Sequence, residues 1–361
     1  MTSDLTYGPV AAFQPHPIRL VTVATRVGFL GAGLIARFHA EMLAISRETF
    51  TRGPVFDPAG ERATRFAADL GYTAARSEQA VLEAVDAVYV TTWTSEHHRL
   101  VAEAAARGVH VFCEKPLAVD ARDAREVVAA AERAEIVNQC GLILRRSPAF
   151  GLVQRLLADP AAGRPMAVVF RDDQFIPVRG TYGSDWRADP RRAGAGTLLE
   201  HSIHDLDLLQ WLLGPVSTVA CRTEAFHGLP GIEDVAAATV AFESGATASL
   251  VSVWHDLDER PSLRHVELFC ERAYMAVEGD WSGPVRYRFA GDAEETEVEG
   301  EELPAEARRR GARLGNPDGS FLRAIRDGRP AWPSFRDALA AHDLVDACYR
   351  SAADGGSVQA L

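Results

Sequence analysis

Between Arg26 and Leu144, short apolar runs alternate with segments that carry apolar residues at helical spacing. The apolar runs are RVGFLGAG, GPVFD, AVYVTT, HVFCEK and IVNQCGLIL, and segments such as EQAVLEAV and RLVAEAAARG lie between them. Strands that alternate with helices along a chain form a parallel sheet with helices on both faces. The pattern therefore predicts an α/β fold over residues 25–146, built on a doubly wound parallel sheet.

After Pro148 the order of the predicted elements changes. A helix over 150–159, a strand at MAVVFRDD, a loop rich in Arg, Asp and Gly, and a second helix near 197–213 come first. Strand-like runs then follow one another, at STVACRTEAF, DVAAATVAFESGATASLVSVWH, RHVELFCERAYMAVEG and GPVRYRFAG, before a last helix over 335–356. Successive strands joined by turns form antiparallel sheets. We expect an α+β domain with an open, mainly antiparallel sheet over 147–361, and an N-terminal extension over 1–24.

The charge and composition of the chain argue against several classes of protein. A formal net charge of −12 without a basic block argues against nucleic acid or an anionic membrane as a partner. No run of 18 apolar residues could span a membrane, and the first 24 residues lack the pattern of a secretory signal. The five cysteines are scattered and form no CxxC pair, so neither a disulfide framework nor a zinc site is indicated. We expect a cytoplasmic protein without a bound metal.

A glycine motif marks the first predicted turn. Gly31, Gly33 and Ala36 form GxGxxA directly after the strand RVGFL and at the start of the helical LIARFHAEML. Such a turn lets the backbone approach a pyrophosphate at the helix N-terminus, which is typical of a Rossmann domain, although a tight turn without a ligand is the simpler interpretation. Asp57 follows 24 residues after Gly33 and would bind the ribose hydroxyls, which favours NAD over NADP. Arg62, on the next helix, is either a phosphate contact or an exposed helix residue.

One lysine stands out from the composition. The chain has 38 Lys and Arg residues together, and Lys115 is its only lysine. Unlike guanidinium, an ammonium group is compact and its pKa can move into a useful range. Lys115 lies where HVFCEK ends, and the carboxyl edge of an open α/β sheet is where ligands bind. The position indicates a chemical role, with chance survival in a surface loop as the alternative.

At this point the sequence resembles the Gfo/Idh/MocA family, which includes glucose-fructose oxidoreductases and inositol dehydrogenases. The resemblance covers nearly the whole chain from Arg26 and rests on GFLGAGLIA, VFDPAGERA, TTWTSEHH, AAARGVHVFCEKPLA and GAGTLLEHSIHDLDLLQWLLG. It implies that Lys115 and His204 carry catalysis, with Glu200 one turn before the histidine. The family more often has aspartate at position 200, an apolar residue and glycine at 201 and 202, and proline at 93.

The helical spacing of the second predicted helix is consistent with this assignment. Glu200, His204, Asp207 and Trp211 fall on one face at i, i+4, i+7 and i+11, whereas leucine and isoleucine occupy another. A polar stripe on an apolar helix needs a polar environment to face. We expect Glu200 to raise the pKa of His204 slightly or to fix its tautomer. A core histidine paired with Glu200 is the alternative.

Position and resemblance together predict the residues of the site. Cofactor contacts are expected from Gly31, Gly33, Leu34, Ile35, Asp57, Arg62, Thr91, Thr92, Trp93, His97 and Glu114. Substrate contacts are expected from Arg146, Trp186, Arg187, His201 and Asp207.

The predicted reaction is the reversible oxidation of a secondary alcohol on a sugar, an inositol or another cyclic polyol. His204 would act as the base, NAD as the hydride acceptor, and Lys115 would hold the oxygen. A glycosidase that uses transient oxidation by NAD and a non-catalytic sensor of NAD or sugar remain as alternatives. Zinc is disfavoured because His201 and His204 are spaced i, i+3 rather than i, i+4. The resemblance also implies a homodimer or homotetramer that covers the open sheet.

Overall fold

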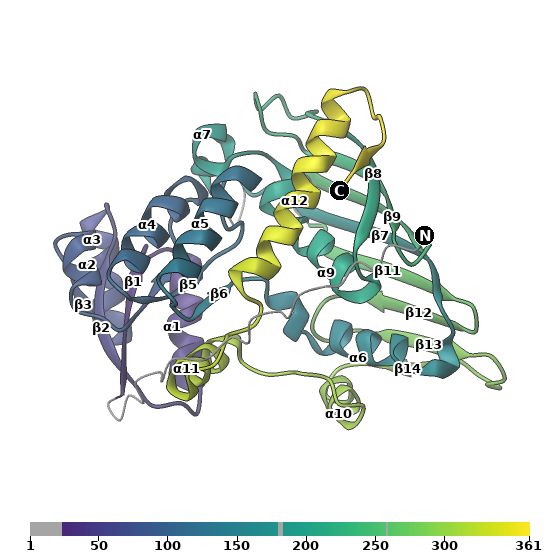
Figure 1. Cartoon of the computed structure of the whole chain (residues 1–361), viewed down its shortest axis with the longest axis horizontal. Helices are drawn as coiled ribbons and strands as arrows, with labels where there is room; N and C mark the ends of the chain where they lie inside the picture. Colours follow the sequence, from purple (N-terminus) through teal and green to yellow (C-terminus); the bar gives the residue numbers. More distant parts are fainter. Residues whose placement is uncertain (1–23, 180–182, 258) are drawn as a thin grey trace, which may run out of the picture.

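The computed structural model describes residues 24–179, 183–257 and 259–361. The predicted extension over 1–24 lies outside these residues except for Ala24. The described chain forms two sheets that lie side by side, each covered by helices (Figure 1).

The first sheet is parallel throughout, with strand order β3-β2-β1-β4-β5-β6. Its strands are β1 (Thr25–Leu30), β2 (Phe50–Phe56), β3 (Thr73–Ala74), β4 (Ala87–Val90), β5 (His110–Cys113) and β6 (Asn138–Cys140). Its helices are α1 (Leu34–Ile45), α2 (Gly60–Leu70), α3 (Glu78–Leu82), α4 (Thr94–Ala106) and α5 (Ala121–Arg133). The order reverses between β1 and β4, which is the switch point where this fold binds ligands. The predicted doubly wound sheet is confirmed, although the last strand is shorter than IVNQCGLIL and β3 was not predicted.

The second sheet is mixed but mainly antiparallel, with order β14-β13-β12-β11-β7-β10-β9-β8-β15. Its strands are β7 (Pro165–Phe175), β8 (Val216–Glu224), β9 (Val235–Phe242), β10 (Thr247–His255), β11 (Leu263–Cys270), β12 (Ala273–Glu278), β13 (Val285–Phe289), β14 (Thr296–Val298) and β15 (Gln359–Ala360). β7 pairs in parallel with β10, and the other neighbours in the described sheet run antiparallel. The predicted open, mainly antiparallel sheet is confirmed.

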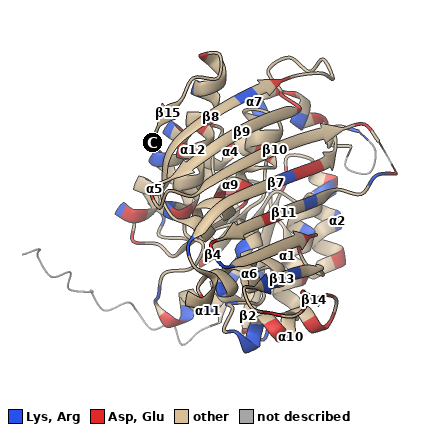
Figure 2. Cartoon of the chain, turned by 90° about the vertical axis from the view of Figure 1, so that its right-hand side faces the viewer, with Lys and Arg blue, Asp and Glu red and all other residues tan. Residues whose placement is uncertain are grey.

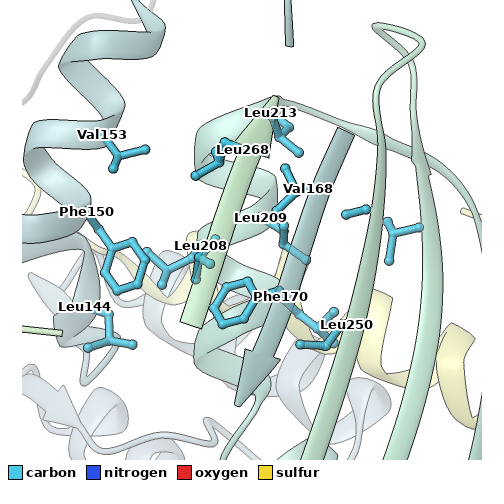
Figure 3. Close-up of a cluster of buried hydrophobic side chains, with 14 of the residues drawn as sticks. Leu144, Phe150, Val153, Val168, Phe170, Leu208, Leu209, Leu213, Leu250 and Leu268 are labelled. Carbon is cyan, nitrogen blue, oxygen red and sulfur yellow. The ribbon is translucent and has the colours of Figure 1, made fainter. Parts of the chain in front are cut away.

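The helices of the second half lie on one face of this sheet. They are α6 (Pro148–Leu157), α8 (Thr197–Glu200), α9 (Ile203–Leu213) and α12 (Phe335–Ala353). Of the other helices, α7 (Pro190–Ala193) contacts α4, α10 (Glu302–Arg309) contacts α6, and α11 (Pro317–Asp327) contacts α1. Short 3-10 helices are η1 (Ile143–Arg146), η2 (Pro160–Ala162) and η3 (Asp185–Ala188). Side chains of α6 and α9 meet those of β7, β10 and β11 in a buried apolar layer, shown in Figure 3.

The prediction of one continuous helix over 197–213 is wrong, because the helix breaks at His201 and Ser202 between α8 and α9. The Ser202 hydroxyl, fully buried, lies 2.6 Å from Ser252 Oγ and 3.2 Å from an oxygen of Asp172. A serine side chain bound to groups outside its own helix lets the backbone leave the helical path. Glu200 and His204 therefore belong to two different helices, so the 3.6-residue period of a single helix does not predict their relative positions.

The last third of the chain packs against both sheets. Phe321, Leu322 and Ile325 of α11 belong to the apolar core of the first sheet. Phe335 near the start of α12 packs with the other core of that sheet, whereas Leu344 further along packs with the second sheet. Figure 1 shows α12 running between the two halves. Parts of the segment 147–361 therefore pack against the first sheet as well as the second.

The outer face of the second sheet is uncovered in the described chain, as Figure 2 shows. Its adjacent strands β7, β10 and β11 expose Val169, Val251 and Phe269 on this face. No helix of the described residues is long and apolar enough to cross a membrane.

Candidate active site

The glycine turn has the geometry that a dinucleotide needs. Gly31 has φ +96°, and a Cβ there would lie 2.6 Å from the Thr91 carbonyl oxygen, so only glycine fits. Gly33 starts α1 and has open space where its Cβ would be. No described side chain caps α1, and its first turn has no acidic residue, so its N–H groups are available to a phosphate.

The surface beside this turn fits a bound NAD. Leu34 and Ile35, in the first turn of α1, are 76 % and 37 % exposed. Apolar side chains of this size at the mouth of the turn are the groups that a dinucleotide would cover. The residues present therefore fit the cofactor that the glycine motif predicts.

Asp57 follows the carboxyl end of β2 and also shapes the turn. Its Oδ2 accepts the Ala32 N–H at 3.0 Å, its Oδ1 accepts the Ala59 N–H at 2.9 Å, and the carboxylate is nearly buried. Arg62 Nε lies 3.5 Å from Asp57 Oδ1, and its side chain is about half exposed. Asp57 is thus fixed at the edge where the ribose would lie, with lone pairs to spare.

The segment between β4 and α4 is held by its own backbone contacts. The Thr91 hydroxyl donates to the Leu30 carbonyl at 3.0 Å, and the Thr92 hydroxyl donates weakly to the Trp93 carbonyl at 3.4 Å. The guanidinium of Arg192 on α7 lies 4.0 Å from the centre of the Trp93 ring. The tryptophan that replaces the usual proline therefore contacts the second half of the chain by a cation–π interaction.

Lys115 reaches from the first half of the chain to the second. Its Nζ donates to the backbone carbonyl of Glu200 at 2.5 Å, at the end of α8. Burial and the charge of Arg187 lower the pKa of Lys115 below its ordinary value of 10.5, although Glu200 and Glu114 oppose this. The lysine is partly buried and retains two N–H groups for a ligand.

Glu114 is one end of a buried chain of charged groups. His39 of α1 lies between Glu114 Oε1, 3.0 Å from its Nε2, and Asp318 Oδ1, 2.7 Å from its Nδ1. Burial alone would lower the pKa of His39, but the two carboxylates raise it to about 10. Glu114 also accepts the backbone N–H of Lys115 at 3.2 Å, and Gly141 leaves the room that its carboxylate occupies.

Glu200 does not pair with His204 as expected. Its Oε1 accepts the Thr94 hydroxyl at 2.7 Å, and its Oε2 accepts Arg187 Nε at 3.0 Å. Both oxygens are therefore bound to groups of α4 and η3 and not to the histidine. Glu200 connects the two halves of the chain at the site.

His204 lies in a positive environment. It is 8 % exposed, and its Nδ1 has no hydrogen-bond partner among the described residues. Burial, together with the charges of Lys115 and Arg264, lowers its pKa well below the ordinary 6.5. The expectation that Glu200 raises this pKa is wrong, since the charges that act on His204 are cations.

A buried arginine, not predicted from the sequence, organises the far side of the site. Arg264 Nε donates to Asp205 at 2.6 Å, its Nη1 donates to Asp280 at 2.7 Å, and its Nη2 lies 3.3 Å from Asp172. The same Nη2 is 3.1 Å from Nε2 of His201. Burial raises the pKa of Asp205 to about 7, although Arg264 opposes the shift.

The remaining predicted substrate residues divide into two groups. Trp186 and Arg187 stack on each other at 4.3 Å, next to Glu200. Asp207 is instead bound by both Nε and Nη2 of Arg145 in a buried ion pair, and Arg146 donates to the Trp332 carbonyl at 2.8 Å. The structure thus brings Trp186 and Arg187 to Glu200, and gives Asp207 and Arg146 other partners.

The residues that the sequence did not reveal come from distant segments. The residues are His39, Thr94, Asp172, Asp205, Arg264, Asp280, Asp318 and His342, which contact residues of the site, Leu117 after Lys115, or one another. The only local signal was the high polarity of IHDLD and FRDD beside apolar runs. Within the described ranges, no group of three or more His, Cys, Asp and Glu side chains is arranged to hold a metal ion.

Comparison with protein families agrees with this arrangement. Residues 25–142 match the family described as oxidoreductase family, NAD-binding Rossmann fold. Residues 150–276 match the GFO/IDH/MocA C-terminal domain. Together the two matches cover most of the described chain.

Named relatives are sugar and polyol enzymes. The chain is 35% identical over 232 residues to 1,5-anhydro-D-fructose reductase of Ensifer adhaerens, covering 62% of this chain and 67% of the relative. It is 30% identical over 286 residues to D-apiose dehydrogenase of Paraburkholderia graminis, covering 77% and 73%. Among solved structures, levoglucosan dehydrogenase in complex with NADH and levoglucosan has a TM-score of 0.83 at 20% identity, over 94% of this chain and 99% of that one. This last similarity concerns the fold.

Proposed function

Because the chain belongs to the Gfo/Idh/MocA family of NAD-binding oxidoreductases, we propose that it oxidises a secondary alcohol of a sugar, inositol or other cyclic polyol, reversibly, with Lys115 and His204 as the catalytic pair. The dehydrogenases and reductases among its relatives support this substrate class. The observation that carries the proposal is that the ammonium of Lys115 reaches the segment that bears His204. Lys115 of the first half bonds the carbonyl of Glu200, four residues before His204 of the second half.

The charges around His204 suit a base in the oxidation direction. A base must be neutral before it takes the hydroxyl proton, and burial beside Lys115 and Arg264 keeps the imidazole neutral. The same two cations favour the negative charge that develops on the substrate oxygen. One arrangement therefore serves both the removal of the proton and the stabilisation of the alkoxide.

Lys115 is the group that would hold the substrate oxygen. One of its N–H groups is used by the Glu200 carbonyl, which fixes the direction of the ammonium, and the others can donate to the oxygen. Bound NAD would supply the hydride acceptor, with Gly31, Gly33, Asp57 and the open start of α1 holding it. Trp186 and Arg187 would contact the ring of the substrate.

A substrate panel tests the proposal. Purified protein is mixed with sugars, inositols and aminocyclitols in the presence of NAD or NADP, and the absorbance of the reduced nicotinamide is followed. We expect reduction with at least one polyol, and faster reduction with NAD than with NADP because Asp57 would repel a 2′-phosphate. Tight binding of NADH without reduction by any member of the panel would contradict the proposal.

A further inference from the structure

The backbone of the three residues after Glu114 is held by buried side chains, two of them histidines and the third Glu114 itself. Lys115 N–H donates to Glu114, which His39 of α1 holds in turn. The Pro116 carbonyl accepts Nδ1–H of His97 from α4 at 2.8 Å. The Leu117 N–H donates to Nε2 of His342 from α12 at 3.0 Å. We call the segment Lys115, Pro116 and Leu117 the lysine turn.

His342 is the most distant of these contacts along the chain. It is 1 % exposed, lies 225 residues after Leu117, and belongs to the helix that runs between the two sheets (Figure 1). Because Nε2 accepts a hydrogen bond, it carries no proton, and the ring must be neutral with its hydrogen on Nδ1. Burial lowers the pKa of His342 to about 3, with Asp120 opposing and His97 adding to the shift. The ring is therefore a permanent acceptor over the ordinary pH range.

We propose that His342 is a positioning residue for Lys115: its Nε2 holds the Leu117 N–H and so fixes the turn from which the lysine reaches the Glu200 carbonyl. The inference rests on the proposed catalytic role of Lys115. Leu117 is completely buried, so its N–H finds no water if the histidine is replaced by an apolar group. The turn must then shift until that N–H finds another acceptor, and the lysine shifts with it.

The single lysine of the chain allows a direct test of its position. Protein grown with carbon-13-labelled lysine has one lysine spin system, so its Cε signal reports Lys115 alone. The charged groups that act on Lys115 are Arg187, Arg264, Glu200 and Glu114, and burial lowers its pKa from 10.5. A lysine that leaves this buried position must titrate closer to the ordinary value, so the direction of the change is defined.

Two substitutions separate the hydrogen bond from the bulk of the ring. In H342L no acceptor remains, whereas in H342Q the amide Oε1 takes the place of Nε2. We expect the Lys115 titration midpoint to rise toward the ordinary 10.5 in H342L, and to stay at the wild-type midpoint in H342Q. If H342L does not fold, H342A removes the acceptor with less crowding, and the same rise is expected.

Ser351 offers a matched control on the same helix. Its Oγ is also a buried side-chain acceptor for a backbone N–H, that of Cys221 at 2.8 Å, but it lies in the last turn of α12, away from the lysine turn. S351A should leave the Lys115 midpoint unchanged. An unchanged midpoint in folded H342L or H342A, or an equal rise in S351A, would overturn the proposal.

Turnover gives the second readout. With a polyol substrate, we expect kcat to fall about 10- to 100-fold in H342L, and the Kd of NADH to change less than about 3-fold, since the glycine turn is untouched. H342Q should restore most of the rate. If no polyol is oxidised even by the wild type, the proposed function fails, whereas the titration midpoints still decide whether His342 positions the lysine.

Discussion

At the scale of single residues, Lys115 is defined by the small size of its ammonium group. It bonds the Glu200 carbonyl at a partly buried position, where a planar guanidinium would need a wider set of partners. We expect Lys115→Arg to lower kcat/KM at least about 100-fold, as loss of an oxyanion donor does. The Kd of NADH should stay within a few-fold, because the glycine turn is unchanged. Arg122→Lys, at an exposed position, is the matched exchange and should retain full activity.

The pH profile of the oxidation follows from the same two residues. His204 must be neutral and Lys115 protonated for the proposed reaction. The pKa of His204 is well below 6.5 and that of Lys115 is below 10.5. On the acid side, kcat/KM should fall only below pH 6.5, where His204 becomes protonated. On the alkaline side, it should fall before pH 10.5, where Lys115 loses its proton. Measurement of kcat/KM across this range checks both limbs, and an acid limb centred above pH 6.5 would rule out His204 as the base.

At the scale of elements, the break between α8 and α9 decides which groups meet at the site. The break depends on the buried Ser202 hydroxyl, which contacts Ser252 and Asp172 of the second sheet. We expect Ser202→Ala to lower the free energy of unfolding by about 1–3 kcal/mol, because a buried carboxylate and a buried hydroxyl lose a partner. Denaturant titration measures the change.

A serine on the outer face of the sheet provides the comparison. Ser249 of β10 is exposed, so Ser249→Ala should change the free energy of unfolding by less than about 0.5 kcal/mol. Equal losses in the two variants would show that the break does not depend on the Ser202 contacts.

At the scale of the whole molecule, the outer face of the second sheet is not covered by any helix of the described residues. Val169, Val251 and Phe269 lie on three adjacent strands and are each at least 39% exposed. Exposed apolar patches of this kind mark association surfaces. We expect a homodimer or homotetramer in solution and its dissociation by Val169→Glu, measured by light scattering after size exclusion. Val358→Glu, at an exposed valine next to the edge strand β15, should not change the mass, and a monomeric wild type would contradict the expectation.

Features that depend on local spacing were determined by the sequence alone. The alternation of strands and helices has a period that can be counted along the chain, and the doubly wound and antiparallel sheets follow from it. The turn at Gly31 needs a positive φ that only glycine adopts easily, so the motif located the tight turn between β1 and α1. Lys115 could be identified as the only lysine by counting residues, which needs no structure.

Features that depend on which distant groups come within hydrogen-bonding distance were decided by the tertiary structure. Glu200 pairs with Thr94, 106 residues away, and Arg264 pairs with Asp205, 59 residues away. His342 reaches the lysine turn because α12 packs between the two sheets. Partner choice for a buried polar group depends on packing of whole elements, because the group must bond whatever acceptor or donor the fold brings to it. The pattern of residues along the chain does not show which of these distant groups will lie close together.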